Sequence, residues 1–212
     1  MKPLVRKNGE RGNTMIEFAV VMPFWIAVLF GTIALGTNLT RSIQTVQTSR
    51  DLANMYARGT DFSSAGFQNL ITGDGGLSAS LVQGMDLSGT GNAVIYLSQV
   101  RHVYSTDNDC AAGTCGNAGS DVFVNQVVFG NTALFASYLG PSPPSSDLDV
   151  HDNTKNPTTL AGDRTNQHAL FASTYPMPGN GTVAFVVEVF VASQDVTFLG
   201  FTGAGNYSRA VF

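Results

Sequence analysis

The longest feature of the hydrophobic pattern is an uninterrupted apolar stretch near the start of the chain. Residues 18–36 (FAVVMPFWIAVLFGTIALG) carry no charge, and none occurs between Glu17 and Arg41. A membrane-spanning helix needs about 20 apolar residues, so this segment is long enough to cross a bilayer. Pro23 would kink a helix in water, but membrane helices tolerate proline better. The pattern therefore predicts a membrane helix over 18–36.

Beyond this stretch, residues 37–58 mix polar and apolar side chains at helical spacing. The apolar positions recur at intervals of four, three, seven and four residues: Leu39, Ile43, Val46, Ala53 and Ala57. This recurrence predicts one face of an amphipathic helix that packs on a globular head. Gly59 is a typical stop signal. We expect one continuous helix over 13–58, about 69 Å long; the alternative is two helices separated at a glycine of the apolar stretch.

The rest of the chain, residues 59–212, has the pattern of a β-rich head. Strands are predicted at 93–104, 121–130, 182–192 and the C-terminal SRAVF. The first two strands are joined by a turn-rich loop and predict an antiparallel hairpin. A long helix and an antiparallel sheet can bury each other's apolar sides, so the predicted fold class is α+β.

The segments between the strands are less regular. Residues 63–71 suggest a short helix, and 131–140 either a short helix or a further strand. Residues 141–167 hold four of the eight prolines, which predicts an exposed loop. Glu188 interrupts the strand at 182–192. It is either a buried polar contact or an outward-facing position, and the second is preferred because charged side chains are rarely fully buried.

Charge is sparse and unevenly distributed. Charged residues make up 12% of the 212 residues, against roughly 25% in typical domains. The net charge is −4, but residues 1–12 hold four bases and one acid, so the remainder is more acidic. The chain after residue 12 therefore lacks the clusters of Lys and Arg that binding of nucleic acid requires. The basic flank before the apolar stretch predicts a cytoplasmic N-terminus and an extracytoplasmic head.

The two cysteines, Cys110 and Cys115, are separated by four residues. In an oxidising compartment this spacing predicts a disulfide that closes a small loop. Two free thiols are the alternative. A metal pair is disfavoured because the spacing is not C-x-x-C and no second ligand pair is near.

The sequence gives no sign of catalysis. The three histidines are far apart in the chain: His102, His151 and His168. Motifs of metalloproteases, α/β-hydrolases and phosphate-binding loops are absent from the sequence, so we expect no enzyme and no cofactor. A weak calcium candidate is formed by three acids: Asp147, Asp149 and Asp152. The glycine and glutamate of a calcium loop are missing, so a solvated acidic loop is preferred.

Glu17 is the unexplained residue, because a carboxylate within a bilayer is costly. A secretory signal, cut after Gly36, would have a shorter apolar region of about 7–15 residues. An uncleaved anchor fits the length, but neither interpretation explains Glu17. A cut after Gly12 would make Asn13 the first residue. The ammonium of a neighbouring subunit could then pair with Glu17 and fix the register between subunits.

The N-terminal quarter of the chain resembles type IV pilin-like proteins, and more narrowly the TadE/TadG-like minor pilins (pseudopilins) of the tight-adherence system. The residues that carry the resemblance are the basic leader, Arg11-Gly12, MIEF at 15–18, VVMP at 20–23, Phe30-Gly31 and SRDLANMYARG at 49–59. The C-terminal VVEVFVASQDVTF and NYSRAVF resemble the last strand and closing segment of that family.

This resemblance implies a leader over 1–12, a helix over 13–58 and an extracytoplasmic head over 59–212. It implies cleavage between Gly12 and Asn13 by a prepilin peptidase, with Arg11 before the cut and Glu17 as the assembly residue. The expected partners are other pilins, the inner-membrane assembly platform and the membrane. The expected function is assembly of a Tad-type pilus or secretion apparatus for adhesion. The alternative is a membrane-anchored receptor or adhesin that does not assemble.

Overall fold

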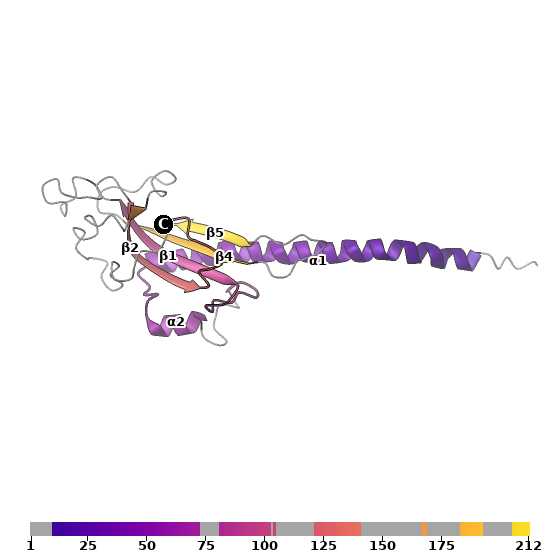
Figure 1. Ribbon diagram of the computed structural model, residues 1–212, viewed down its shortest axis with the longest axis horizontal. Coiled ribbons are helices and arrows are strands. Elements are labelled where there is room, and N and C mark those ends of the chain that lie inside the picture. The colour runs from indigo at the N-terminus through magenta and orange to yellow at the C-terminus, as the bar shows by residue number, and fades with distance from the viewer. Residues whose placement is uncertain are drawn as a thin grey trace, which may run out of the picture.

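The structure is a computed structural model that describes residues 10–72, 81–102, 104, 121–140, 167–168, 183–192 and 205–212. Its elements are α1 (Glu10–Ala57), α2 (Ala65–Thr72), β1 (Ala93–His102), β2 (Asp121–Gly130), β3 (Gln167–His168), β4 (Val183–Val191) and β5 (Asn206–Val211). Figure 1 shows the sheet packed beside the C-terminal part of α1, while the N-terminal part projects as a free arm. The long helix and the sheet form the α+β fold expected from the sequence.

α1 is one helix of 48 residues, about 72 Å long. It continues through Pro23, Gly31 and Gly36, so the separation into two helices does not occur. The helix begins at Glu10, three residues before the predicted start. The bond between Gly12 and Asn13 therefore lies within its first turn.

The predicted stop at Gly59 is confirmed by its geometry. Gly59 has a φ of 84°, a left-handed conformation that glycine adopts without a steric cost. Its N–H donates to the Tyr56 carbonyl at 3.0 Å, and the Thr60 N–H donates to the Met55 carbonyl at 3.1 Å. These two bonds form a Schellman motif, which satisfies carbonyls that the end of the helix leaves without partners.

The sheet has five strands in the order β3-β2-β1-β4-β5, and every neighbouring pair is antiparallel. The predicted pairing of the first two strands is confirmed, with Leu97 of β1 opposite Val127 of β2. Leu97 also lies opposite Val187 of β4, so β1 is the central strand. The predicted strands near the C-terminus are present as β4 and β5.

One face of the sheet forms the main core. α1 packs on β4 and β5, and residues between α1 and β1 complete the same apolar cluster: Phe62, Ile71, Val82, Met85 and Leu87. α2 begins two residues after the predicted short helix and buries Ile71. The helix and the sheet therefore bury each other's apolar sides, as the fold class requires.

The opposite face of the sheet is covered in part by residues 131–140. This segment was expected to be a helix or a strand, and it is neither, because it consists of turns and bends. Glycines with positive φ stand at both ends, Gly130 at 95° and Gly140 at 111°. Leu139 joins a second apolar cluster with Val100 and Phe123. Burial of side chains on the sheet, not backbone periodicity, holds this segment in place.

The face of α1 that meets the sheet is not the predicted one. Of the five predicted positions only Ala53 is buried, whereas Leu39, Ile43 and Val46 are 64%, 52% and 36% exposed; Ala57 is exposed as well. The buried residues of α1 are Thr45, Thr48, Ser49, Leu52, Ala53 and Tyr56. Helical spacing shows which residues share a face, but it does not show which face the sheet covers.

Candidate functional site

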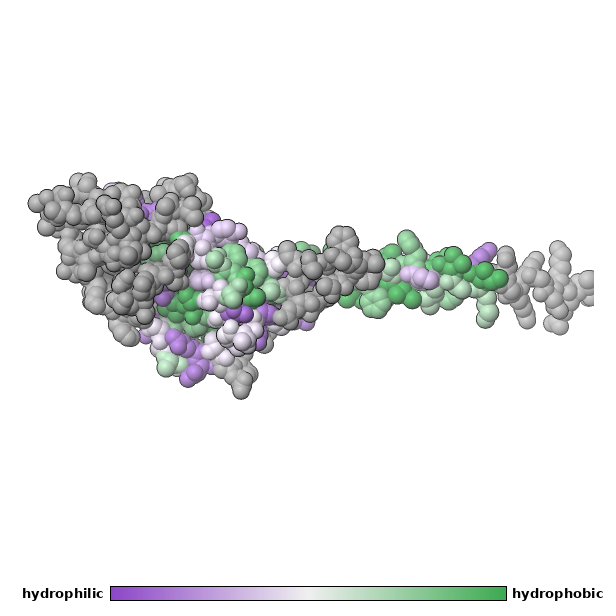
Figure 2. All heavy atoms as spheres, in the orientation of Figure 1, coloured by the Kyte–Doolittle hydropathy of each residue, from purple (hydrophilic) through white to green (hydrophobic). Residues whose placement is uncertain are grey.

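The projecting arm of α1 is apolar over its whole circumference. Figure 2 shows the arm as mostly hydrophobic spheres, and large apolar side chains from Met15 to Leu35 are exposed along it. Over Met15–Ala57 the helix is long and apolar enough to cross a membrane. A membrane anchor and a signal sequence both meet this criterion.

Glu17 is the only ionisable residue between Met15 and Thr40. It lies four residues, or about 6 Å of rise, beyond Asn13 on the same side of α1. The structure thus places the carboxylate one turn from the backbone of the predicted cleavage site. Glu17 and the predicted cleavage residues belong to the N-terminal part of α1, which Figure 1 shows projecting away from the sheet.

Polar residues of α1 face the head. The hydroxyls of Ser49 and Ser208 of β5 lie 2.8 Å apart and are buried. The Thr48 hydroxyl donates to the Leu81 carbonyl at 3.3 Å, and the Gln44 side-chain oxygen accepts from the Gln83 N–H at 3.0 Å. Hydrogen bonds therefore fasten the helix to the head in a region where apolar contacts were expected.

Glu188 of β4 is buried, at 1% exposure, so the expected outward-facing position is wrong. Its carboxylate accepts hydrogen bonds from the Ser137 hydroxyl, from the Tyr138 N–H at 3.2 Å and from the Tyr207 hydroxyl at 2.8 Å. Residues 131–140 lie over the carboxylate and exclude water from it. A buried carboxylate is tolerated when donors surround it, which these three groups do.

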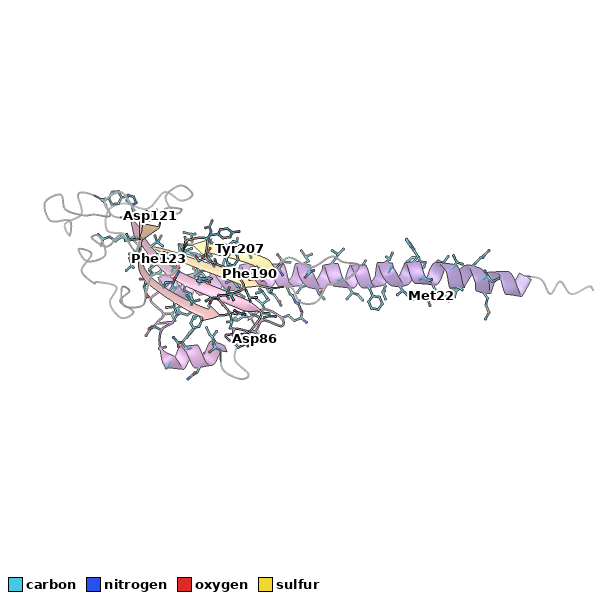
Figure 3. All side chains as sticks on the ribbon, viewed as in Figure 1. Met22, Asp86, Asp121, Phe123, Phe190 and Tyr207 are labelled. Atoms are coloured by element: carbon cyan, nitrogen blue, oxygen red, sulfur yellow. The ribbon has the colours of Figure 1, made fainter. Side chains whose placement is uncertain are left out.

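An aromatic cluster surrounds this carboxylate. Phe135 stacks on Phe190 with ring centroids 5.0 Å apart, and Tyr207 contacts Phe135 and Tyr138, each at 5.0 Å. Figure 3 shows Phe190 and Tyr207 side by side on the sheet, where they are cross-strand partners. Burial, and then the negative charge of Glu188, raise the pKa of Tyr207 above its ordinary value. The cluster fastens residues 131–140 to β4 and β5.

His102 has a structural partner. Its Nδ1 lies 2.7 Å from the Asp121 carboxylate, which is buried at the first position of β2. The ring also contacts Tyr104 edge-on, at a centroid distance of 4.6 Å. His102 is therefore a strand residue whose side chain is satisfied by Asp121.

Several other predicted residues lie outside the residues that the structure describes: Cys110, Cys115, Asp147, Asp149, His151 and Asp152. His168 lies in β3, where its backbone pairs with Asp121. The side chains of Arg11 and Asn13 are likewise outside the described part, although their backbone is helical. Within the described ranges there is no group of three or more His, Cys, Asp or Glu residues that could hold a metal ion.

Comparison of the chain with protein-family models, with curated protein sequences and with solved structures finds no match.

Two features were missed by sequence reasoning: the outward apolar positions of α1 and the buried Glu188. A signal for the first was available, since Thr45, Thr48 and Ser49 recur at helical spacing and form a coherent polar face. Either face of such a helix can meet a sheet if that sheet supplies hydrogen-bonding groups. For Glu188 no signal existed in the strand itself, because its donors come from residues about 50 and 19 positions away in the chain.

Proposed function

We propose that this protein is a minor pilin or pseudopilin that assembles into a Tad-type pilus or secretion apparatus, after a prepilin peptidase cuts between Gly12 and Asn13. The observation that carries the proposal is the bare apolar arm of α1 with a single carboxylate, Glu17, near its start. The role is structural and involves no catalytic step by this chain. Its partners are the peptidase, the inner-membrane assembly platform and other pilins.

The chemistry of Glu17 supports this function. A charged side chain within the membrane-spanning part of a helix is costly and usually pairs with another group, so a carboxylate there points to a functional role. After a cut at Gly12, α1 would start at Asn13, and Glu17 would be its fifth residue. The free ammonium of a neighbouring subunit would offset the charge and fix the axial register between the two helices.

The leader supports an inserted precursor. Residues 1–12 hold four of the eleven bases, which would keep the N-terminus in the cytoplasm and the head outside. Removal of these bases leaves one new ammonium at the cytoplasmic end of the helix. Loss of that charged flank lowers the cost of extracting the helix from the inner membrane into a filament.

The first test is the N-terminal residue of the protein isolated from membranes of its native host, by intact mass and N-terminal peptide. The proposal expects Asn13. A chain that starts at Met1 would be an anchored receptor or adhesin, and one that starts at Thr37 a secreted protein. Either result would overturn the proposal.

The second test separates assembly from anchoring. Glu17→Gln removes the charge at nearly constant volume, and Asp51→Asn does the same at an exposed position of α1 beyond the apolar arm. The proposal expects both variants to be cut and inserted, while only Glu17→Gln loses its place in sheared filaments. A non-assembling anchor would tolerate Glu17→Gln without any change.

A further inference from the structure

Asp121, the first residue of β2, has a buried carboxylate oxygen without a partner. The residue is 1% exposed, and its Oδ1 lies 2.7 Å from His102 Nδ1. Among the described residues, its Oδ2 has no hydrogen-bond partner. A buried carboxylate oxygen that meets neither a donor nor a cation is costly. The Oδ2 atom therefore points to a ligand that the described side chains do not supply.

The register of the sheet places a histidine on each side of Asp121. His102, the last residue of β1, is its partner on one side, and His168, the last residue of β3, is its partner on the other. Residues directly opposite each other on neighbouring strands share a face of the sheet. The side chain of His168 lies outside the described part of the structure, so the backbone register alone places this residue. We name His102, Asp121 and His168 the His-Asp-His row.

The spacing of the His-Asp-His row suits a single metal ion. Residues opposite each other in an antiparallel pair have Cβ atoms about 4.5–5.5 Å apart, so the two histidines begin about 10 Å apart with the carboxylate between them. His102 Nδ1 is 2.7 Å from Asp121 Oδ1, whereas two donors of a tetrahedral zinc ion lie about 3.3 Å apart. A shift of about 0.6 Å would therefore bring both atoms to ligand positions around one ion.

We propose that the His-Asp-His row binds one zinc ion. Two imidazole nitrogens and one carboxylate oxygen form a donor set typical of zinc, and water completes the four-coordinate shell. Calcium and magnesium prefer oxygen donors alone, so the two histidines select against them. The ion neutralises Asp121 and supplies the partner that Oδ2 lacks among the described residues.

Zinc in this place joins three strands at one end of the sheet. The ligands are the last residues of β1 and β3 and the first residue of β2, and Figure 3 shows Asp121 at the end of the sheet away from the projecting arm. β3 has only two residues, so the ion fastens a short edge strand to its neighbour. The ligands are far apart in the chain and match no short metal motif, so only the sheet brings them together.

The test is zinc binding by the full chain, without an affinity tag, purified in detergent micelles and stripped of metal with a chelator. Equilibrium dialysis followed by metal analysis is expected to give one zinc ion per chain. Loss of a hydrogen-bond partner of a ligand already lowers metal affinity about 10–100-fold. His168→Ala removes a ligand itself, so it should raise the Kd for zinc by about 100-fold or more. His151→Ala is the matched control, because it removes a histidine outside the row and should leave the Kd unchanged.

Thermal unfolding gives a second measurement on the same samples. Free zinc at about 100 times its Kd should raise the Tm of the parent chain by about 5–11 °C, and that of the His168→Ala variant by far less. Calcium at the same concentration should leave both Tm values unchanged. His102→Gln, which keeps a polar side chain beside Asp121, is a second variant that should lose zinc binding. Circular dichroism of the metal-free samples checks that each variant keeps the fold of the parent.

Three results would overturn the inference: a parent chain that binds no zinc at micromolar concentrations, a His168→Ala variant that binds zinc as tightly as the parent, or a His151→Ala variant that loses zinc as well. Loss of zinc binding on replacing both Cys110 and Cys115 by serine would also overturn it, because the ligands would then be thiolates. The pilin proposal is tested separately, through the N-terminal residue and Glu17.

Discussion

Glu188 provides the sharpest test of how the head is held together. Glu188→Gln removes the charge and keeps the shape, and one side-chain oxygen can still accept from Tyr138 and Tyr207. The amide NH₂ would then face the Ser137 hydroxyl, which already accepts from the Leu139 N–H at 3.0 Å. Hydrogen bonds to charged groups contribute about 1.5–3 kcal/mol and neutral ones about 0.5–1.5. We expect Glu188→Gln to cost about 2 kcal/mol.

Glu188→Leu is the more severe change, because it leaves all three donors without their acceptor. Each stranded donor costs about 1–3 kcal/mol. Tyr138 is exposed, so water can satisfy part of the loss. We expect a cost of about 4 kcal/mol, and a fall in Tm of about 8–16 °C for a chain of this size.

The assay is thermal unfolding of the full chain in detergent micelles, followed by near-ultraviolet circular dichroism of the tyrosines. A double-mutant cycle with Tyr207→Phe isolates the contact at 2.8 Å. The Glu188→Gln and Tyr207→Phe effects should be non-additive by about 1 kcal/mol. Additive effects, or a Glu188→Gln variant as stable as the parent, would refute the account of Glu188 as the fastening group.

Three further predictions concern a glycine of β2, the contact between α1 and β5, and the ionisation of Tyr207. Gly130→Ala should lower the free energy of unfolding by more than about 2 kcal/mol, because a Cβ would lie 2.2 Å from the Ala93 carbonyl oxygen. Gly66 of α2 has open space around it, so Gly66→Ala should raise the free energy of unfolding by up to about 1 kcal/mol in the same melt. Ser49→Ala should cost about 1–2 kcal/mol, because it strands the buried Ser208 hydroxyl; adding Ser208→Ala should recover part of the loss, and no recovery would contradict the pair. Burial raises the pKa of Tyr207 above 10.0. The contribution of the protonated Tyr207 side chain to the stability of the fold should therefore be complete below pH 10 and be lost as the pH rises toward the pKa of the folded state. A tyrosine absorbance titration in which every tyrosine ionises together near pH 10 would contradict this.

Much of the framework follows from the sequence alone. The unbroken apolar stretch and the helical spacing after it predict α1 as a single element, and Gly59 predicts its end. Alternating and β-branched segments predict β1, β2, β4 and β5, and the turn-rich loop predicts the antiparallel pairing of β1 with β2. These are local properties: each depends on residues within one segment, so the pattern of that segment carries the information.

The sequence did not determine which surfaces meet. Leu39, Ile43 and Val46 were expected to face the head because apolar residues usually face a core, yet these three side chains are exposed. α1 meets the sheet through Leu52, Ala53 and Tyr56. The hydrogen bond between Ser49 and Ser208 of β5 adds to this contact. The apolar residues of the segment 131–140 show neither helical nor alternating spacing, and contacts with the sheet determine the conformation of its backbone.

Glu188 shows the same division between local and tertiary information. In the strand it is one charged residue at an alternating position, and its own segment gives no reason for burial. Ser137, Tyr138 and Tyr207 make burial possible, and only the folded chain brings them to one carboxylate. The sequence by itself determined α1, α2 and the strands β1, β2, β4 and β5, and it placed a carboxylate in the apolar arm. It predicted neither β3 nor the turns of residues 131–140. The tertiary structure decided which faces are covered, because the free energy of burying a polar group depends on partners that are distant in the chain.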